Sequence, residues 1–320
     1  MKKTLAAILA GSMLAATAAC IPDDCKRACE TITCTKAYDA YAQEQEALFS
    51  AKAGELKCYN EVLKDAKASN VVYCSELHNS SDGHEFQAKL LKGLYAANPS
   101  IVVFMEMFQA NSQKTLDSYL GSEMSEDEFL KKVDWNHTWG FDYKFYKPII
   151  DFAKEKKLKI IAMDAPLSIV RKVARQGLEA LTEEEKAGLP HVKLDNERYR
   201  SIIVDELKRM HDKMAKMDDA ACQRYYEAFC LRNDVMAGNI LKNTKNGEKA
   251  FVIVGAGHAD YIGGVPKRVA EQSSMKSLIL APYALCPEEE ESKNSEEGKS
   301  YDFDAEYADY YYFIPEPKDE

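Results

Sequence analysis

The sequence lacks the marks of several large protein classes. Its 320 residues carry 42 basic and 52 acidic side chains, a net charge of −10, and this acidic balance argues against a nucleic-acid partner. It has no phosphate-binding P-loop, no dinucleotide fingerprint and no nucleophile elbow. The sequence therefore does not indicate a common nucleotide-binding fold or a serine hydrolase. No internal repeat occurs, and no apolar run after the first 20 residues could span a membrane.

The N-terminus has the pattern of an export signal. Two lysines precede an apolar run from Leu5 to Ala19, which ends in small residues before Cys20. The run AATAAC resembles the lipobox of bacterial lipoproteins, although Thr17 replaces the usual Leu. We therefore expect residues 1–19 to be a signal peptide and Cys20 to be lipidated, which would anchor the protein in the outer membrane facing the periplasm. Without acylation, the same signal predicts a periplasmic protein.

Nine cysteines occur, and eight remain once Cys20 is set aside. In an exported protein an even number favours disulfides, here up to four, with the pairing left open. Cys222 and Cys230 are expected on one helix about 12 Å apart, too far to bridge each other. The spacing of Cys25, Cys29 and Cys34 matches no common zinc pattern.

Five apolar segments separated by helical stretches predict the fold class, an α/β domain. Four of the five are β-branched runs too continuous for a half-exposed sheet, which indicates burial on both faces. The expected architecture is a mostly parallel central sheet flanked by helices. The predicted strands are Val71–Glu76, Ile101–Phe108, Lys159–Asp164, Ala250–Val254 and Ser277–Tyr283.

A long helical insertion is expected before the fourth strand, with charged helices at Asp195–Lys216 and Asp218–Lys242. The rest of the chain divides by composition. We expect a Cys-rich tether at 20–35 and the α/β domain at 36–286, which begins with an amphipathic helix over 36–67 that could break near Gly54. An acidic linker is expected at 287–300, and an aromatic acidic tail at 301–320 with a candidate edge strand at Tyr310–Ile314.

Four of the predicted strands end in carboxylate or imidazole side chains. In open α/β sheets, ligands bind beyond the carboxyl ends of the strands, so these side chains are expected to meet. As a set they suit a divalent metal, with Glu106 or His78 as the base that acts on a metal-bound water. Taken singly, each could be a helix cap or a satisfied polar residue. The candidate metal ligands are Glu76, His78, Glu106 and His258, and Asp164 at the end of the third strand is a candidate ligand-binding residue.

Two further groups lie near this edge in the sequence. His84 and Gln87 would share one face at the start of a helix, with Asp82 as its cap. The segment 134–148 holds both tryptophans and several other aromatic side chains. It could line a flat apolar ligand site or fill part of the core, and the sequence leaves both open. Its candidate ligand residues are His137, Trp139, Tyr143 and Tyr146.

Together these motifs resemble the ChaN-like haem-binding uptake proteins of the Tiki superfamily. The resemblance runs in order from about Val71 to the tyrosine-rich tail. It rests on Glu76-Leu77-His78, His84 with Gln87, Met105-Glu106-Met107-Phe108 with Gln113, Trp135 to Trp139, Tyr146-x-Pro148, Asp164-Ala165-Pro166, Asp234-x-Met236-Ala237, Gly255-Ala256-Gly257-His258 with Gly264 and Pro266, and Ala308-Asp309-Tyr310.

The resemblance implies a bacterial, often lipid-anchored protein that holds haem or an iron compound at the envelope. Its partners would then be the haem or iron compound and, through the lipid, a membrane; a homodimer is compatible with it. Haem would need an apolar slot and an axial ligand, for which Tyr143, Tyr146 and His137 are candidates. No Cys-x-x-Cys-His motif occurs, which excludes covalent c-type haem.

The superfamily also implies a second reading. Other members are metal-dependent proteases or esterase-like enzymes that use paired Gly-x-x-His motifs with a Glu. Here the second motif is intact from Gly255 to His258, whereas the first has Ser75 in place of Gly. A metal-dependent hydrolase is therefore the alternative, and Ser75 also keeps open a site that has lost activity. Whether the protein is an enzyme stays open at this point.

Overall fold

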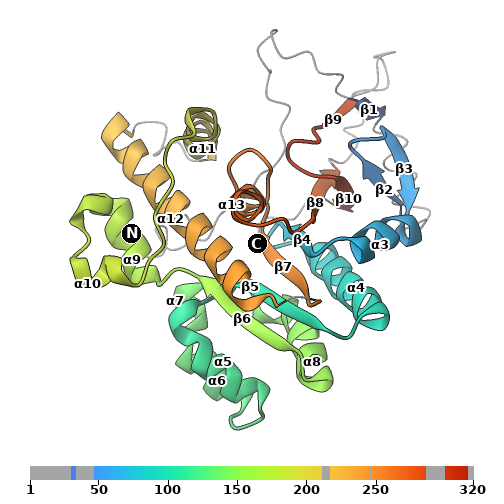
Figure 1. The fold of residues 1–320 in the computed structure, drawn as a ribbon, viewed down its shortest axis with the longest axis horizontal. Helices are drawn as coiled ribbons and strands as arrows, with labels where there is room; N and C mark the ends of the chain where they lie inside the picture. The colour runs from blue at the N-terminus through green and yellow to red at the C-terminus, as the bar shows by residue number, and fades with distance from the viewer. Residues whose placement is uncertain (1–29, 34–46, 211–216, 246, 286–299, 316–320) are drawn as a thin grey trace.

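A central sheet of eight strands organises the chain (Figure 1). The computed structural model describes residues 30–33, 47–210, 217–245, 247–285 and 300–315. The strand order is β3-β2-β10-β8-β4-β7-β5-β6, and a separate antiparallel pair is formed by β1 and β9. The strands are β1 Glu30–Thr33, β2 Ala47–Ser50, β3 Glu55–Cys58, β4 Val71–Glu76, β5 Ile101–Gln109, β6 Lys159–Asp164, β7 Lys249–Gly255, β8 Ser277–Leu285, β9 Ser300–Phe303 and β10 Tyr310–Pro315.

The sheet is mostly parallel, as the sequence predicted. The strands from β10 to β6 all run in parallel, and only β2 and β3 are antiparallel to their neighbours. Every residue of β4 and β7 is buried, which explains their continuous apolar runs. The predicted edge position of the last strand is wrong. β10 lies inside the sheet, with Tyr310 opposite Leu280 of β8 and Tyr311 opposite Phe49 of β2.

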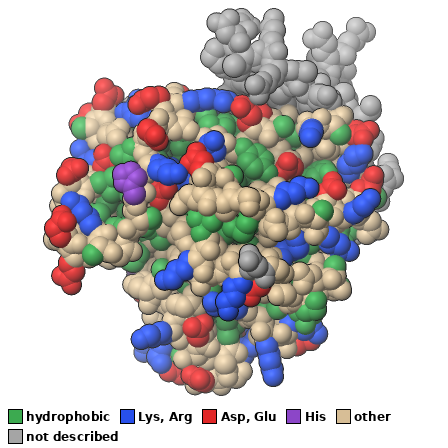
Figure 2. All heavy atoms as spheres, in the orientation of Figure 1, with side chains coloured by type: hydrophobic (Ala, Val, Ile, Leu, Met, Phe, Trp, Pro, Cys, Tyr) green, Lys and Arg blue, Asp and Glu red, His purple; other side chains and the backbone are tan. Residues whose placement is uncertain are grey.

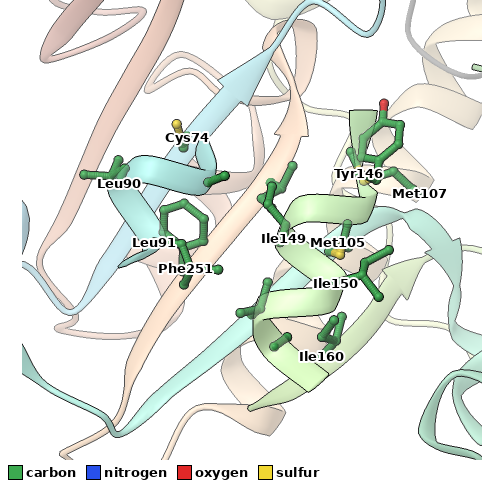
Figure 3. Packing of buried hydrophobic residues seen from close by; sticks show 14 of the residues in the cluster. Cys74, Leu90, Leu91, Met105, Met107, Tyr146, Ile149, Ile150, Ile160 and Phe251 are labelled. Atoms are coloured by element: carbon green, nitrogen blue, oxygen red, sulfur yellow. The ribbon is translucent and has the colours of Figure 1, made fainter. Parts of the chain in front are cut away.

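Helices cover both faces of the sheet (Figure 1). Alternate strand residues enter two separate hydrophobic clusters, one with α4 and α8 and the other with α12 and α13. Figure 3 shows Ile149 and Ile150 of α8 and Leu90 and Leu91 of α4 packed over the strands. The helices on the first side are α3 Tyr59–Ala68, α4 Ser81–Ala97, α5 Gln113–Leu120, α6 Glu126–Lys132, α7 Trp135–Thr138 and α8 Lys147–Lys156, with the 3₁₀ turns η1 Ala110–Ser112 and η2 Tyr143–Phe145.

The predicted helical insertion is present between β6 and β7. It contains α9 Leu167–Gln176, η3 Leu178–Ala180, α10 Glu183–Ala187, α11 Glu197–Met210 and α12 Asp219–Asn243. After β7 come η4 Ala256–His258 and α13 Val265–Gln272. Helix α12 is the longest of these, and nearly every residue from Tyr225 to Ala237 is buried. On the face drawn in Figure 2, acidic and basic side chains are intermingled over the surface.

The helix predicted over 36–67 is confirmed only in its last part, and the described residues before it are not helical. Residues 47–58 form the hairpin β2–β3, which turns at Gly54 (φ +68°), and only α3 is helical. Leu48 and Phe49 are buried because β2 pairs with β10, so tertiary pairing overrides the local helix propensity of this segment. β1 falls within the segment expected to be a tether and pairs with β9, while the domain boundaries stay a prediction.

Several predictions concern residues outside the described part of the chain. The signal peptide and Cys20 lie there, as do four of the other cysteines. Among the described residues, Cys58, Cys74, Cys222 and Cys230 are unpaired, so none of the expected disulfides forms between them. The same residues include no helix that is long and apolar enough to cross a membrane.

Candidate functional site

The predicted convergence of strand ends is present. β4, β7, β5 and β6 are neighbours in the sheet and run in parallel, so their carboxyl ends share one edge. The side chains there form a buried group that we call the strand-end cluster, namely Glu76, His78, Glu106, Asp164, His258 and, from α12, Arg232.

Glu76 is the acceptor for one half of this cluster. Its Oε1 lies 2.8 Å from Nδ1 of His78 and accepts the Tyr146 hydroxyl at 2.8 Å. Its Oε2 accepts the Gln87 amide at 2.9 Å and lies 3.6 Å from Nδ1 of His84. Burial alone would raise the pKa of Glu76, but the nearby His84 and His78 rings outweigh it and lower the pKa. The carboxylate is therefore ionised and fully solvated by protein donors.

Arg232 is the hydrogen-bond donor of the other half, which contains Glu106, Asp164 and His258. Its guanidinium donates to Asp164 from Nε and Nη2 at 2.8–3.1 Å and to Oε1 of Glu106 at 2.6 Å. Its Nη1 lies 3.1 Å from Nε2 of His258, whose Nδ1 lies 2.6 Å from Oδ1 of Asn233. Since an arginine only donates, His258 accepts through Nε2 and donates from Nδ1, which defines a neutral tautomer.

The pKa shifts agree with these roles. Burial raises the pKa of Glu106, and the positive charge of Arg232 offsets only part of that rise. Burial, followed by repulsion from Arg232, lowers the pKa of His258 well below its usual value. Burial disfavours the charge on Arg232, yet Asp164 and Glu106 more than compensate and raise its pKa. The cluster is thus organised around a permanent arginine cation.

This arrangement does not match the metal site that the sequence suggested. No three His, Cys, Asp or Glu side chains of the described residues are grouped so that they could hold a metal ion. The reason is visible in the contacts: Arg232 lies against Glu106, Asp164 and His258, where a cation would otherwise bind. In this structure Glu76, His78, Glu106 and His258 belong to a hydrogen-bonded network that contains an arginine, and their metal-ligand role stays a prediction.

Access to the cluster is also narrow. A recess of about 10 Å³ beside Asp164 and Arg232 is lined by Trp139, Thr138 and Leu167 among others. That volume is barely what one water molecule needs. In this conformation the recess admits no organic substrate.

Close packing at Gly255 joins the two halves of the cluster. A Cβ on Gly255 would lie 2.8 Å from a ring carbon of His78 and 3.4 Å from Oε2 of Glu106, so only glycine fits between them. The Gly255 amide donates to that same Glu106 oxygen at 2.5 Å. Ser75, the departure from the Gly-x-x-His pattern, is accommodated because its hydroxyl donates to the Leu280 carbonyl at 3.2 Å inside the sheet.

The aromatic segment mostly fills the core. Trp139 donates from its indole nitrogen to the Tyr146 hydroxyl at 2.9 Å, and that hydroxyl donates to Glu76 at 2.8 Å. The polar atoms of both side chains are therefore engaged in the hydrogen bonds around Glu76. Tyr143 is buried against Trp135 in the same hydrophobic cluster. His137, by contrast, is exposed and lies 2.7 Å from Asp134, and no contact between described side chains joins it to the cluster. Of the two readings left open, core filling is the one observed.

An open groove lies on the other side of His84. It has a volume of about 400 Å³ and runs between α4 and the segment from η2 to the start of α8. Its lining includes Lys89 and Lys92 of α4 on one wall and Lys144, Phe145 and Pro148 on the other. We call it the lysine groove. The volume is within the range of small-molecule sites in proteins.

Comparison with known proteins assigns the family. The family model described as "Haem-binding uptake, Tiki superfamily, ChaN" matches residues 62–269, more than half of the chain. The protein belongs to this ChaN family. The solved structure of cofacial heme binding to ChaN of Campylobacter jejuni has the same fold, with a TM-score of 0.64 at 16% identity over 83% of this chain and 95% of that chain.

Two other proteins also resemble this ChaN family member. Protein RETICULATA-RELATED 5, chloroplastic, of Arabidopsis thaliana is 23% identical over 230 residues, which are 68% of this chain but 30% of that protein. The chain therefore spans less than a third of the length of that relative. A mutant of the erythromycin esterase EreC in its open conformation matches with a TM-score of 0.44 at 14% identity over 72% of this chain and 74% of its own.

Sequence reasoning about this ChaN family member missed Arg232. The signal was present, since Arg232, Asn233 and Asp234 interrupt a helix that is otherwise apolar at this point. Three consecutive polar residues in a buried helix need partners, because unpaired buried charges are costly. Asp234 pairs with Arg268 in the same way, away from the strand-end cluster.

Proposed function

We propose that this protein binds haem reversibly, without turnover, as part of haem or iron uptake. The observation that carries the proposal is the family match over residues 62–269, supported by a fold shared with a ChaN protein along nearly its whole length. That Campylobacter protein binds heme cofacially, and the lysine groove offers this chain an open site of suitable size. Bound haem would supply the iron, and the chain would supply the slot and the charge that orient it.

The residues of the groove suit haem as a ligand. Phe145 and Pro148 form an apolar wall against which the tetrapyrrole could pack. The lysine ammonium groups of the lining could pair with its two propionates. The recess beside Asp164 and Arg232 at the strand-end cluster is far smaller, about the size of one water molecule. The alternative, a metal-dependent hydrolase, is less well supported, since Arg232 lies where its metal would bind.

A hemin titration tests the proposal. Adding hemin to the purified full chain should produce a Soret band that saturates at a defined stoichiometry, with both buried tryptophans, Trp135 and Trp139, reporting by fluorescence quenching. An unrelated acidic protein of similar charge is the control for non-specific uptake. Identical spectra for the two proteins would reject haem binding. The alternative function, a metal-dependent hydrolase, is tested by metal analysis and by assays against panels of peptides and esters. It is supported only if the wild type is active and the His258→Ala variant has lost that activity.

We further propose export and lipid anchoring at Cys20, from the signal pattern that precedes it. Metabolic labelling with palmitate and the mass of the mature N-terminus test this, with Cys20→Ser as the control. Label in the wild type and none in the variant is the expected result. A cleaved N-terminus without acylation would instead support a periplasmic protein. A homodimer is also proposed, and sedimentation of the purified protein measures it.

A further inference from the structure

One edge of the central sheet carries positive charge although the chain as a whole is acidic. The parallel strands β8, β4, β7, β5 and β6 begin at this edge, opposite to the edge that holds the strand-end cluster. Each of these strands is preceded by a helix and a short connection. We use the name basic edge for the last turn of each helix, the connection and the first strand residue, which are residues 65–71, 94–101, 153–159, 240–249 and 269–277.

All the cationic side chains of the basic edge are lysines. Its five ranges contain nine lysines, no arginine and four acids, a balance of nine minus four, or +5, in a chain whose net charge is −10. Five helices end at this edge, and the carboxyl end of each is equivalent to about half a negative charge. Those helix ends therefore offset only about half of the excess, and the edge stays positive.

Most of these lysines have no acidic partner. Of the nine, Lys156 pairs with an acid among the described residues, and its partner Glu155 is exposed, so the pair is weak. Five others are exposed and pair with no described acidic side chain, namely Lys67 at the end of α3, Lys157 after α8, Lys242 and Lys245 around the end of α12, and Lys276 before β8. Their ammonium groups are therefore available to a partner at the surface.

Hydrogen bonds join the five ranges into one continuous surface. The Asn70 amide donates to the Lys276 carbonyl at 2.8 Å, and the Lys276 amide donates back to Oδ1 of Asn70 at 2.8 Å. Lys249 donates from Nζ to carbonyls at the end of α3 and from its amide to the last carbonyl before β5, at 2.9 Å. Nζ of Lys159 donates to Oδ1 of Asn243 at 3.2 Å. Since neighbouring strands are about 4.8 Å apart, the five strand starts form a row about 19 Å long.

The kind of charge favours a membrane over other anionic partners. Arginine binds carboxylates and phosphates through two fixed hydrogen bonds, whereas lysine is a hydrated point charge on a flexible stem. Lysine is depleted from protein–protein interfaces, and the acidic balance of the whole chain argues against nucleic acid. Lysines near an anionic bilayer each add to the attraction and need no fixed geometry. A row of lysines without arginine therefore fits the diffuse charge of phospholipid headgroups.

We propose that the basic edge docks this protein on an anionic phospholipid surface. The rest of the chain carries −15, which is −10 minus +5, so such a surface attracts the edge and repels the remainder. Docking therefore orients the molecule, with the strand-end cluster on the side away from the bilayer. The lysine groove also lies away from the bilayer, because it is lined by the amino-terminal parts of α4 and α8, whose carboxyl ends belong to the basic edge.

Vesicle sedimentation tests the docking and needs no haem. The chain 21–320 keeps every residue that the structure describes and lacks the acylation site, so no lipid chain contributes. We expect it to bind at least about tenfold more tightly to vesicles with about a third phosphatidylglycerol than to pure phosphatidylcholine. Raising the salt from about 0.1 M to about 0.5 M should remove this difference. Equal binding to the two kinds of vesicle, or binding to neither, would overturn the inference.

A pair of variants with equal charge change locates the docking surface. The edge variant removes one exposed lysine from each of four ranges, Lys67→Gln/Lys157→Gln/Lys242→Gln/Lys276→Gln. It should bind the anionic vesicles at least about tenfold more weakly than the wild type. The control removes four exposed cations of α6, α9 and α10, Lys131→Gln/Lys132→Gln/Arg175→Gln/Lys186→Gln, and should change the affinity less than about threefold.

Lysine acetylation on the vesicles, read by mass spectrometry, then gives the orientation. In the wild type, the lysines changed in the edge variant should lose reactivity when anionic vesicles are added, whereas the lysines changed in the control should keep it. If the edge variant, folded by circular dichroism, binds as the wild type does, or if both variants lose equal affinity, the basic edge is not the docking surface. Protection of the control lysines instead would show that another face docks. A failure of haem binding would leave all of these readouts unaffected.

Discussion

Removing Arg232 is the sharpest test of how the strand-end cluster is held together. Its side chain is 3% exposed and contacts Asp164, Glu106 and His258. The change Arg232→Met keeps much of the volume but leaves two carboxylates without their cation. Asp164 retains some solvent contact, whereas the Glu106 side chain has none, so Glu106 should account for most of the cost.

The expected loss is about 3–5 kcal/mol in the free energy of unfolding at pH 7, which is typical when one partner of a buried ion pair is removed. Domains are stable by about 5–15 kcal/mol, so the variant should still fold. Urea unfolding followed by tryptophan fluorescence measures it. Adding Glu106→Gln to Arg232→Met should restore at least about 1 kcal/mol, because a neutral amide removes the cost of protonating Glu106 on folding at pH 7.

The pH dependence of this variant has a definite sign. Burial already raises the pKa of Glu106, and loss of Arg232 raises it further. Folded Arg232→Met then keeps a proton that the unfolded chain releases near pH 4.3, so stability falls as pH rises above that value, by up to about 1.4 kcal/mol per pH unit. The deficit relative to wild type should therefore be small near pH 4 and large at pH 7. A deficit below about 1 kcal/mol at pH 7, or one that is flat with pH, would refute the reasoning.

Three further changes test the same structure. Gly255→Ala would place a Cβ 2.8 Å from the His78 ring and should cost about 1–3 kcal/mol in urea unfolding, while Gly188→Ala, with nothing within 4 Å, should cost far less. Lys249→Met removes an ammonium that donates to three carbonyls at the end of α3 and should cost about 1–3 kcal/mol; an unchanged midpoint would contradict this. His258 is neutral when folded because burial lowers its pKa, so wild-type stability should fall by up to about 1.4 kcal/mol per pH unit below pH 6.5, and His258→Gln should lack that share of the slope.

The parallel core of the fold could be predicted because its signal is local. The strands at 71–76 and 159–164 have the predicted bounds, and the predicted segment 250–254 is one residue short at each end. The hairpin β2–β3 could not be predicted in this way. Its residues are good helix formers, and they become strands because β10 supplies a pairing partner from the other end of the chain.

The candidate site was predictable up to the point where another element enters it. Parallel strands must bring their carboxyl ends together, and for that reason Glu76, Glu106 and His258 were identified from the sequence alone. The local sequence does not determine the direction in which α12 crosses that edge of the sheet. The position of Arg232 depends on that direction, and its guanidinium pairs with both Glu106 and Asp164.

The two regions of this protein are connected through His84. Its ring forms the floor of the lysine groove beneath Phe145, while its nitrogens face Gln87 and the His78 carbonyl, both of which belong to the surroundings of Glu76. A buried ionised carboxylate with several fixed donors is a rigid support, because releasing any donor leaves the charge under-solvated. The surroundings of Glu76 therefore fix the His84 ring on which Phe145, a residue of the groove lining, is stacked.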